Sequence, residues 1–193
     1  MKGEGMKPRA SNPPMKATLS TVLSAAGQRD LPCLLIGGNA VILLGFPRMT
    51  IDLDLLVPAK ERSQWLDLMR ELGFRLLHGT EGFAQFEPGK EEMAPVDLMF
   101  VDALTWANLY TEARQVIVGD HPVCIPRVEH LIALKLHAAA SPTRDAREQD
   151  WEDIRQMVRA WHLDPADPYF REIILRYGGE EAMNRILSYR NEN

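Results

Sequence analysis

Residues 37–40 read Gly-Gly-Asn-Ala, and residues 48–54 read Arg-Met-Thr-Ile-Asp-Leu-Asp. The short apolar run at 33–36 that enters the glycine pair is typical of a buried strand leading into a tight turn. A helix is expected at about 39–44, followed by a loop at 45–50. The alternation of aspartate with isoleucine and leucine over 51–57 then predicts a second strand. These segments predict a strand, glycine turn, helix and strand in series.

The two aspartates of the second strand carry the chemistry. In a strand, Asp52 and Asp54 would point to the same face with Cα atoms roughly 6.6 Å apart. Their carboxylates would repel each other unless a cation neutralised them, and magnesium prefers such oxygen ligands. Asp97 is isolated within the apolar run 95–100 and supplies a third acid on another predicted strand. Alone, Asp52 and Asp54 fit a solvated strand end or a pair of turn caps equally well. With Asp97 and the glycine pair, the pattern favours a site for Mg²⁺ or Mn²⁺.

The remaining periodicity predicts an α+β fold, in which a small mixed sheet flanked by helices precedes a helical C-terminal segment. We expect residues 1–14 to be a disordered leader, residues 15–126 to form the α/β core and residues 127–193 to form the helical part. The expected helices lie at 15–26, 59–72, 128–140, 147–161, 168–177 and 180–189, and the further strands at 74–77, 82–86 and 96–101, with a short helix and hairpin within 104–125.

Composition narrows the class of protein. The chain has 193 residues, 46% hydrophobic and 25% charged, which is ordinary for a soluble globular protein. A net charge of −5 argues against a broad basic surface for nonspecific nucleic-acid binding. No apolar run is long enough to span a membrane, so we expect a cytoplasmic protein without a membrane partner. Cys33 and Cys124 lie in apolar strand-like runs, where buried free thiols are the usual state.

Three charged residues in the helical part are further candidates. Lys135 emerges from an apolar helical stripe, so it requires either an anionic partner, such as a triphosphate, or a path along which its ammonium snorkels to water. Asp150 and Asp153 lie three residues apart on one helix face and would equally form a surface pair with neighbouring arginines. In the first part, Arg48 and Thr50 either contact a nucleotide or order their loop.

This ordered series resembles the nucleotidyltransferase superfamily and, within it, the AbiEii-like proteins, many of which are toxins of toxin-antitoxin pairs. The resemblance runs from about residue 34 to 154. It rests on a Gly-Gly turn, an Arg-x-Thr-x-Asp-x-Asp strand, a later strand aspartate, a helix lysine and an Asp-x-x-Asp helix. In this chain the matching positions are Gly37, Gly38, Arg48, Thr50, Asp52, Asp54, Asp97, Lys135, Asp150 and Asp153.

The resemblance implies transfer of a nucleoside monophosphate from a nucleoside triphosphate to an acceptor. Asp52, Asp54 and Asp97 would be catalytic and metal-binding, and the other seven matched residues would bind the nucleotide. The acceptor would be transfer RNA, a protein or a small molecule, and an antitoxin protein is an expected partner. Two alternatives stay open: a noncatalytic binding or regulatory module with the same fold, and an antibiotic-modifying nucleotidyltransferase.

Overall fold

A computed structural model of the chain describes residues 13–118, 121–140 and 146–189. The expected leader, at 1–14, lies outside these residues except for its last two prolines, which begin the first helix. Contacts divide the chain into two compact units, Met1–Pro126 and Arg127–Asn193. We call these the sheet unit and the helical unit.

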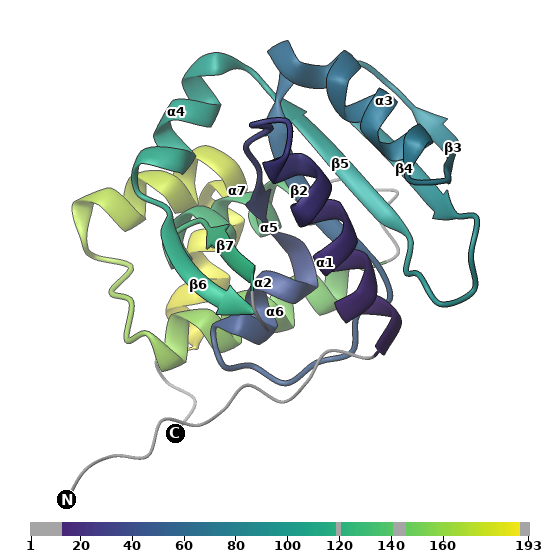
Figure 1. Cartoon of the computed structure of the whole chain (residues 1–193). Helices are drawn as coiled ribbons and strands as arrows, with labels where there is room; N and C mark the ends of the chain where they lie inside the picture. The colour runs from purple at the N-terminus through teal and green to yellow at the C-terminus, as the bar shows by residue number, and fades with distance from the viewer. Residues whose placement is uncertain (1–12, 119–120, 141–145, 190–193) are drawn as a thin grey trace, which may run out of the picture. The chain divides into compact units, whose positions relative to one another are not determined.

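The sheet unit contains a five-stranded mixed sheet with the strand order β1-β2-β5-β4-β3 (Figure 1). Its central strands β2 and β5 are parallel, and the other neighbouring strands pair in antiparallel fashion. A separate antiparallel hairpin joins β6 to β7. The strands are β1 (Leu34–Leu35), β2 (Leu53–Pro58), β3 (Phe74–Gly79), β4 (Phe83–Pro88), β5 (Val96–Val101), β6 (Arg114–Val118) and β7 (His121–Ile125).

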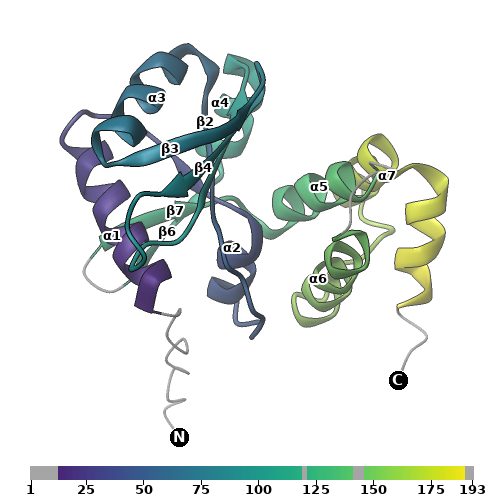
Figure 2. The same cartoon turned by 90° about the vertical axis from the view of Figure 1, so that its right-hand side faces the viewer.

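Helices cover this sheet and complete its core. The helices of the unit are α1 (Pro13–Gly27), α2 (Gly37–Leu43), α3 (Arg62–Glu71) and α4 (Ala103–Thr111), and a 3-10 turn, η1 (Ala59–Glu61), precedes α3. α1 and α3 lie side by side on one face of the sheet (Figure 2). The side chain of Trp65 on α3 and those of Leu55 and Leu98 on the central strands are fully buried. Burial of these large side chains fixes the two central strands against the helices.

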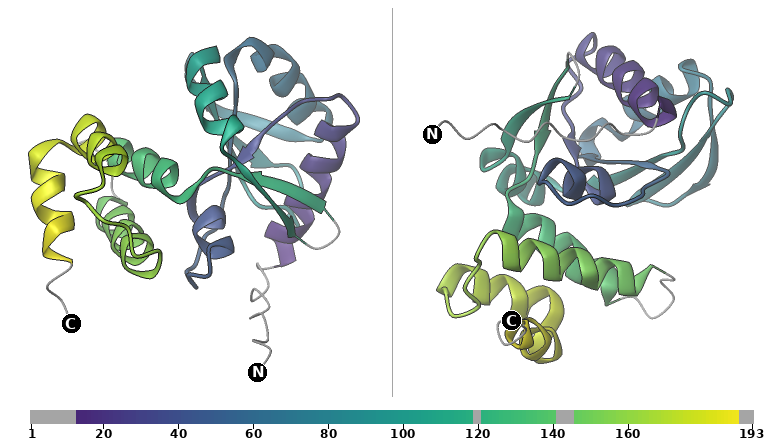
Figure 3. Two further views of the ribbon diagram at one scale, coloured as in Figure 1. Left: turned by 90° about the vertical axis from the view of Figure 1, so that its left-hand side faces the viewer. Right: turned by 90° about the horizontal axis from the view of Figure 1, so that it is seen from below.

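The helical unit consists of three described helices, α5 (Val128–Ala139), α6 (Arg147–Ala160) and α7 (Pro168–Ser188). α5 contacts both α6 and α7 (Figure 3). Apolar side chains such as Ile132, Ile154 and Ile174 are buried where the helices meet. No helix within the described parts of the chain is both long and apolar enough to cross a membrane.

The predicted α+β fold is confirmed, and the differences from the expected elements are local. The two helices expected at 168–177 and 180–189 are both present: α7 consists of two helical stretches that meet at a kink, where Gly179 has the non-helical dihedrals φ 69° and ψ −168°. The strand expected to begin at Ile51 begins at Leu53 instead. As a result, Asp52 lies outside β2, although the alternating pattern placed it within the strand. Cys33 and Cys124 are both free thiols.

Candidate metal and nucleotide site

The central parallel strands bring two of the predicted acids together. β2 and β5 pair in a register that places Asp54 directly beside Asp97. Asp52 immediately precedes β2, and one carboxylate oxygen from each of the three aspartates lies within 4.8 Å of the others. All three side chains are half-buried. The sheet therefore assembles three acids that are up to 45 residues apart in sequence.

The glycine pair lies directly against this cluster. Gly37 begins α2 with φ +61°, and a Cβ atom built on it would be only 1.9 Å from Oδ2 of Asp54. The backbone amide of Ile36 donates a hydrogen bond of 3.1 Å to the Asp54 carbonyl. Gly37 is thus required by both its backbone conformation and its distance from the acid. Any side chain at this position would collide with the Asp54 carboxylate.

The loop before β2 contributes the other predicted residues of the sheet unit. A Cβ atom on Gly38 would lie 2.8 Å from the Thr50 hydroxyl oxygen and 3.1 Å from Cζ of Arg48. Thr50 also donates a hydrogen bond of 3.0 Å to Oδ1 of Asp52. The structure therefore gathers all seven predicted residues of this unit in one place: Gly37, Gly38, Arg48, Thr50, Asp52, Asp54 and Asp97.

One residue at this place was not predicted. The buried side chain of Asn39 donates a hydrogen bond of 2.8 Å to the backbone carbonyl of Asp52. Asn39 directly follows the glycine pair, so the only sequence signal was a polar residue in the first turn of an otherwise apolar helix.

The donor set of the acidic cluster fits a hard divalent cation. Three carboxylates at such short separations repel one another, and a cation would remove that repulsion. Adjacent ligand oxygens of a six-coordinate magnesium ion are about 3 Å apart and opposite ones about 4 Å apart, so the observed spread needs only small side-chain movements. The absence of a side chain at Gly37 allows the Asp54 carboxylate to occupy its place in the cluster, because a Cβ there would lie 1.9 Å from Oδ2. Within the described residues, this is the one group of three or more His, Cys, Asp or Glu side chains whose ligand atoms lie close enough together to hold a metal.

The three predicted residues of the helical unit form an ion-pair cluster. Nζ of Lys135 on α5 lies 2.8 Å from Oδ1 of Asp150 and 2.7 Å from Oδ2 of Asp153, both on α6. Lys135 is 8% exposed and each aspartate 1% exposed. The anionic partner that the apolar surroundings of Lys135 required is thus present within the chain, and the cluster joins α5 to α6.

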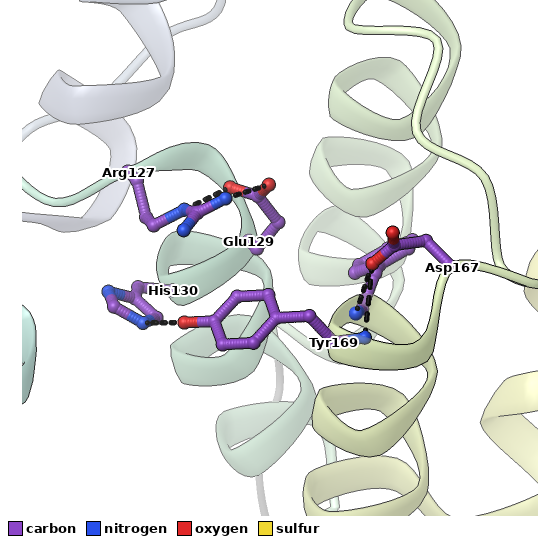
Figure 4. Close-up of polar contacts among 6 residues, drawn as sticks. Arg127, Glu129, His130, Asp167 and Tyr169 are labelled. Carbon is purple, nitrogen blue, oxygen red and sulfur yellow. Dashed lines mark hydrogen bonds and ion pairs between the residues drawn. The ribbon is translucent and has the colours of Figure 1, made fainter. Parts of the chain in front are cut away.

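A cavity of about 450 Å³ lies elsewhere in the helical unit, beside the start of α7. Arg127 donates two hydrogen bonds to Glu129 and lies over the ring of Tyr169, whose hydroxyl is 2.7 Å from Nε2 of His130 (Figure 4). Asp167 accepts hydrogen bonds from the first amides of α7. Glu129, Asp164 and Asp167 line the cavity together with Arg127 and His162, so with a neutral imidazole its walls carry an excess of negative charge.

Comparison with known proteins places this architecture among solved structures. No protein-family model matches the chain, and no curated protein matches it either. The solution structure of the antibiotic-resistance factor ANT(2'')-Ia aligns over 91% of this chain and 91% of that chain, with a TM-score of 0.61 and 19% identity. An antigenic nucleotidyltransferase-like protein from Paracoccidioides brasiliensis aligns over 91% of this chain and 94% of that chain, with a TM-score of 0.58 and 16% identity.

A third match is the lincosamide antibiotic adenylyltransferase LnuA in its lincomycin-bound form. It aligns over 76% of this chain and 99% of that chain, with a TM-score of 0.55 and 13% identity. Identities this low establish similarity of fold alone. The mixed sheet, the acidic cluster beside its central strands and these structural neighbours together identify the chain as a protein of the nucleotidyltransferase-like fold.

Proposed function

We propose that the chain is a metal-dependent nucleotidyltransferase that moves a nucleoside monophosphate from a nucleoside triphosphate to an acceptor hydroxyl. The observation that carries the proposal is the convergence of Asp52, Asp54 and Asp97, with one oxygen of each within 4.8 Å of the others, beside the turn at Gly37. Carboxylates crowded in this way suit a cation that is shared with substrate phosphates. We also propose that the protein is cytoplasmic, as expected from its sequence.

The residues of the sheet unit divide the work between metal and nucleotide. Asp52, Asp54 and Asp97 would hold Mg²⁺ or Mn²⁺. When bound, the metal supplies charge neutralisation at the phosphates and orients the reacting oxygens. Gly37 and Gly38 have no side chains to obstruct a triphosphate, so their backbone amides can approach it closely. The guanidinium of Arg48, which lies next to Gly38, would contribute a positive charge for the phosphates.

The proposed reaction breaks a phosphoanhydride bond of the triphosphate and forms a phosphate ester with the acceptor. The acceptor hydroxyl oxygen attacks the α-phosphorus of the triphosphate and forms a new oxygen–phosphorus bond. The bond between the α-phosphorus and the bridging oxygen to the β-phosphorus breaks, and pyrophosphate leaves with that oxygen. Asp97 would assist loss of the hydroxyl proton, either by accepting it or by holding the metal that the nucleophile approaches. Nothing is oxidised or reduced.

A nucleotide-binding role remains a prediction for Lys135, Asp150 and Asp153. Their mutual ion pairs additionally support a structural role, because a buried lysine held by two buried carboxylates fixes α5 against α6. A lysine with this geometry would bind a phosphate only if the phosphate competed with the two carboxylates. The two roles make different predictions for stability and for nucleotide affinity.

Two classes of acceptor fit this proposal. An AbiEii-like toxin that modifies transfer RNA or a protein, and that pairs with an antitoxin, follows from the sequence resemblance. A small cationic acceptor, as for an antibiotic-modifying enzyme, is favoured by a different observation. The ionisable lining of the cavity in the helical unit comprises Glu129, Asp164 and Asp167 with Arg127 and His162, and this excess of carboxylate over guanidinium suits an amine-bearing molecule better than an RNA phosphate.

Labelling would test the proposal directly. The purified protein is incubated with Mg²⁺, each α-labelled nucleoside triphosphate in turn and a crude cell extract, and the RNA, protein and small-molecule fractions are counted. We expect label in one fraction with the wild-type protein and none with Asp54→Asn, a variant that keeps the size of the side chain. An Asp67→Asn variant, altered at an exposed residue of α3, serves as the matched control.

The noncatalytic alternative predicts a different pattern in the same assay. A binding or regulatory module would label nothing, would bind triphosphate weakly or not at all, and would be unaffected by Asp54→Asn in its interaction with a partner protein. Absence of label in every fraction, together with absence of magnesium-dependent triphosphate binding, would favour this alternative over the enzyme.

A further inference from the structure

The three acids of the cluster are held in place in two different ways. Asp54 and Asp97 lie within β2 and β5, where the backbone hydrogen bonds of a parallel pair fix both residues. Asp52 precedes β2, and the first backbone bond of the pair is made by Leu53, whose amide donates to the carbonyl of Pro95 at 2.8 Å. The position of Asp52 therefore depends on other contacts.

Asn39 provides the first of these contacts. Its side-chain nitrogen donates to the carbonyl oxygen of Asp52 at 2.8 Å, and its side chain is 7% exposed. A carbonyl only accepts hydrogen bonds, so the amide orientation of Asn39 is fixed by its partner. Asn39 lies on α2 directly after the glycine turn, so this bond links the glycine turn to the first acid of the cluster.

Thr50 provides the second contact. Its hydroxyl donates to Oδ1 of Asp52 at 3.0 Å, which orients the carboxylate itself rather than its backbone. Its neighbours Met49 and Ile51 are 89% and 71% exposed, so apolar packing does little to hold this loop. Hydrogen bonds from Asn39 and Thr50 thus hold Asp52, whereas the backbone hydrogen bonds between β2 and β5 position the other two acids.

We infer that Asn39 and Thr50 are positioning residues that set the place and orientation of Asp52 as a metal ligand. This inference rests on the proposed metal-dependent function and assigns Thr50 a role towards Asp52 rather than towards the nucleotide. Hydrogen-bond partners of metal ligands commonly change metal affinity by 10- to 100-fold when they are removed. Loss of either partner lets Asp52 adopt other orientations, so metal binding must then order it at an additional entropic cost.

The test measures metal affinity in the folded protein without nucleotide. Mn²⁺ is titrated into the full chain, and free Mn²⁺ is followed by its electron paramagnetic resonance signal. Asn39→Leu and Thr50→Val remove the two donors with little change in side-chain size, whereas Thr50→Ser keeps the hydroxyl. Val41→Ala serves as the control, because Val41 is fully buried on the same helix and its truncation destabilises the fold without removing either hydrogen bond to Asp52.

Thermal unfolding in the presence of a chelator is recorded for every variant, and titrations are made well below each midpoint. We expect Mn²⁺ affinity to fall about tenfold or more in Asn39→Leu and Thr50→Val, and to stay within about twofold of wild type in Thr50→Ser and Val41→Ala. A purely structural role would lower the melting temperature of Asn39→Leu, as Val41→Ala does, and leave its Mn²⁺ affinity unchanged.

The possible failures are distinguishable. If wild-type protein binds Mn²⁺ and both donor-removing variants bind it equally well, the positioning inference is overturned and the metal site stands. If Thr50→Ser loses as much affinity as Thr50→Val, the hydroxyl contact is not the cause and the inference fails for Thr50. If the wild-type protein takes up no Mn²⁺, with or without triphosphate, the proposed metal site itself is wrong.

Discussion

Replacement of Lys135 by methionine would reveal how strongly the ion-pair cluster stabilises the helical unit. The ammonium of Lys135 lies 2.8 Å and 2.7 Å from carboxylate oxygens of Asp150 and Asp153, which are each 1% exposed. Methionine preserves the stem but removes the charge, so two buried carboxylates would face each other without a cation. Breaking a buried ion pair by removing one partner costs about 3 to 5 kcal/mol. We expect a loss of free energy of unfolding in this range.

Urea unfolding followed by circular dichroism at pH 7 measures this loss by linear extrapolation. For a chain of this size, about 3 to 5 kcal/mol corresponds to a fall in melting temperature of roughly 6 to 20 °C. Lys60→Met is the matched control, because the Lys60 side chain is 74% exposed in its pair with Glu61, so a change within about 0.5 kcal/mol is expected. A loss below about 1 kcal/mol in Lys135→Met would refute the argument from burial.

The same variant separates the structural role from the predicted nucleotide role. Adding Asp150→Asn and Asp153→Asn to Lys135→Met removes the uncompensated charges and should restore much of the lost stability. If Lys135 also binds phosphate, this triple variant will bind triphosphate more weakly than wild type although it is folded. Equal affinity in the folded triple variant would remove Lys135 from the nucleotide site.

Three further outcomes follow from local features. Gly37→Ala should abolish metal binding and lower stability, since its Cβ would lie 1.9 Å from Oδ2 of Asp54 and its φ is +61°. Titration with Mn²⁺ measures the metal affinity, and thermal unfolding measures the stability. Retention of wild-type Mn²⁺ affinity would contradict the close approach of Gly37 to Asp54. Desolvation, reinforced by Cys124, raises the pKa of the Cys33 thiol from 9.0 to about 12. Between about pH 9 and 12 the folded state therefore keeps a thiol proton that the unfolded state loses. The free energy of unfolding is unaffected by this thiol below pH 9 and falls by about 1.4 kcal/mol per pH unit as pH rises towards 12. Between pH 8 and 10.5, wild type should lose about 2 kcal/mol more than Cys33→Ala in urea unfolding, and parallel losses would contradict the assignment. Asp167→Ala removes the cap that accepts the Tyr169 and Phe170 amides and should cost about 0.5 to 2 kcal/mol, whereas Asp167→Asn should cost little.

Periodicity and residue type were sufficient to predict the fold class and the grouping of the acids. Asp97 stood alone in an apolar run, and an isolated acid on a buried strand predicts a partner on the neighbouring strand. The parallel register then places it beside Asp54. The glycine pair predicted a close backbone approach, and the space at Gly37 is indeed too small for any side chain beside Asp54.

Other features depend on tertiary contacts that a local pattern does not contain. The alternation at 51–57 does not reveal which residue makes the first ladder bond, so Asp52 was expected within the strand that begins at Leu53. The apolar neighbours of Lys135 predicted a need for an anion, but the packing of α5 on α6 decides that Asp150 and Asp153 are next to it. Asn39 was missed because a single buried amide carries no spacing signal.

The central claim is that Asp52, Asp54 and Asp97 hold a divalent metal against a nucleoside triphosphate. The most direct test is isothermal titration calorimetry, in which the full chain is titrated with a non-hydrolysable triphosphate analogue. The titration is made with Mg²⁺ and again with a chelator, for the wild-type protein and for Asp97→Asn. The account predicts binding that requires Mg²⁺ and is at least tenfold weaker in Asp97→Asn, because loss of one metal ligand charge weakens the bridge to the phosphates. Binding of equal strength in chelator, or in Asp97→Asn with Mg²⁺, would contradict it.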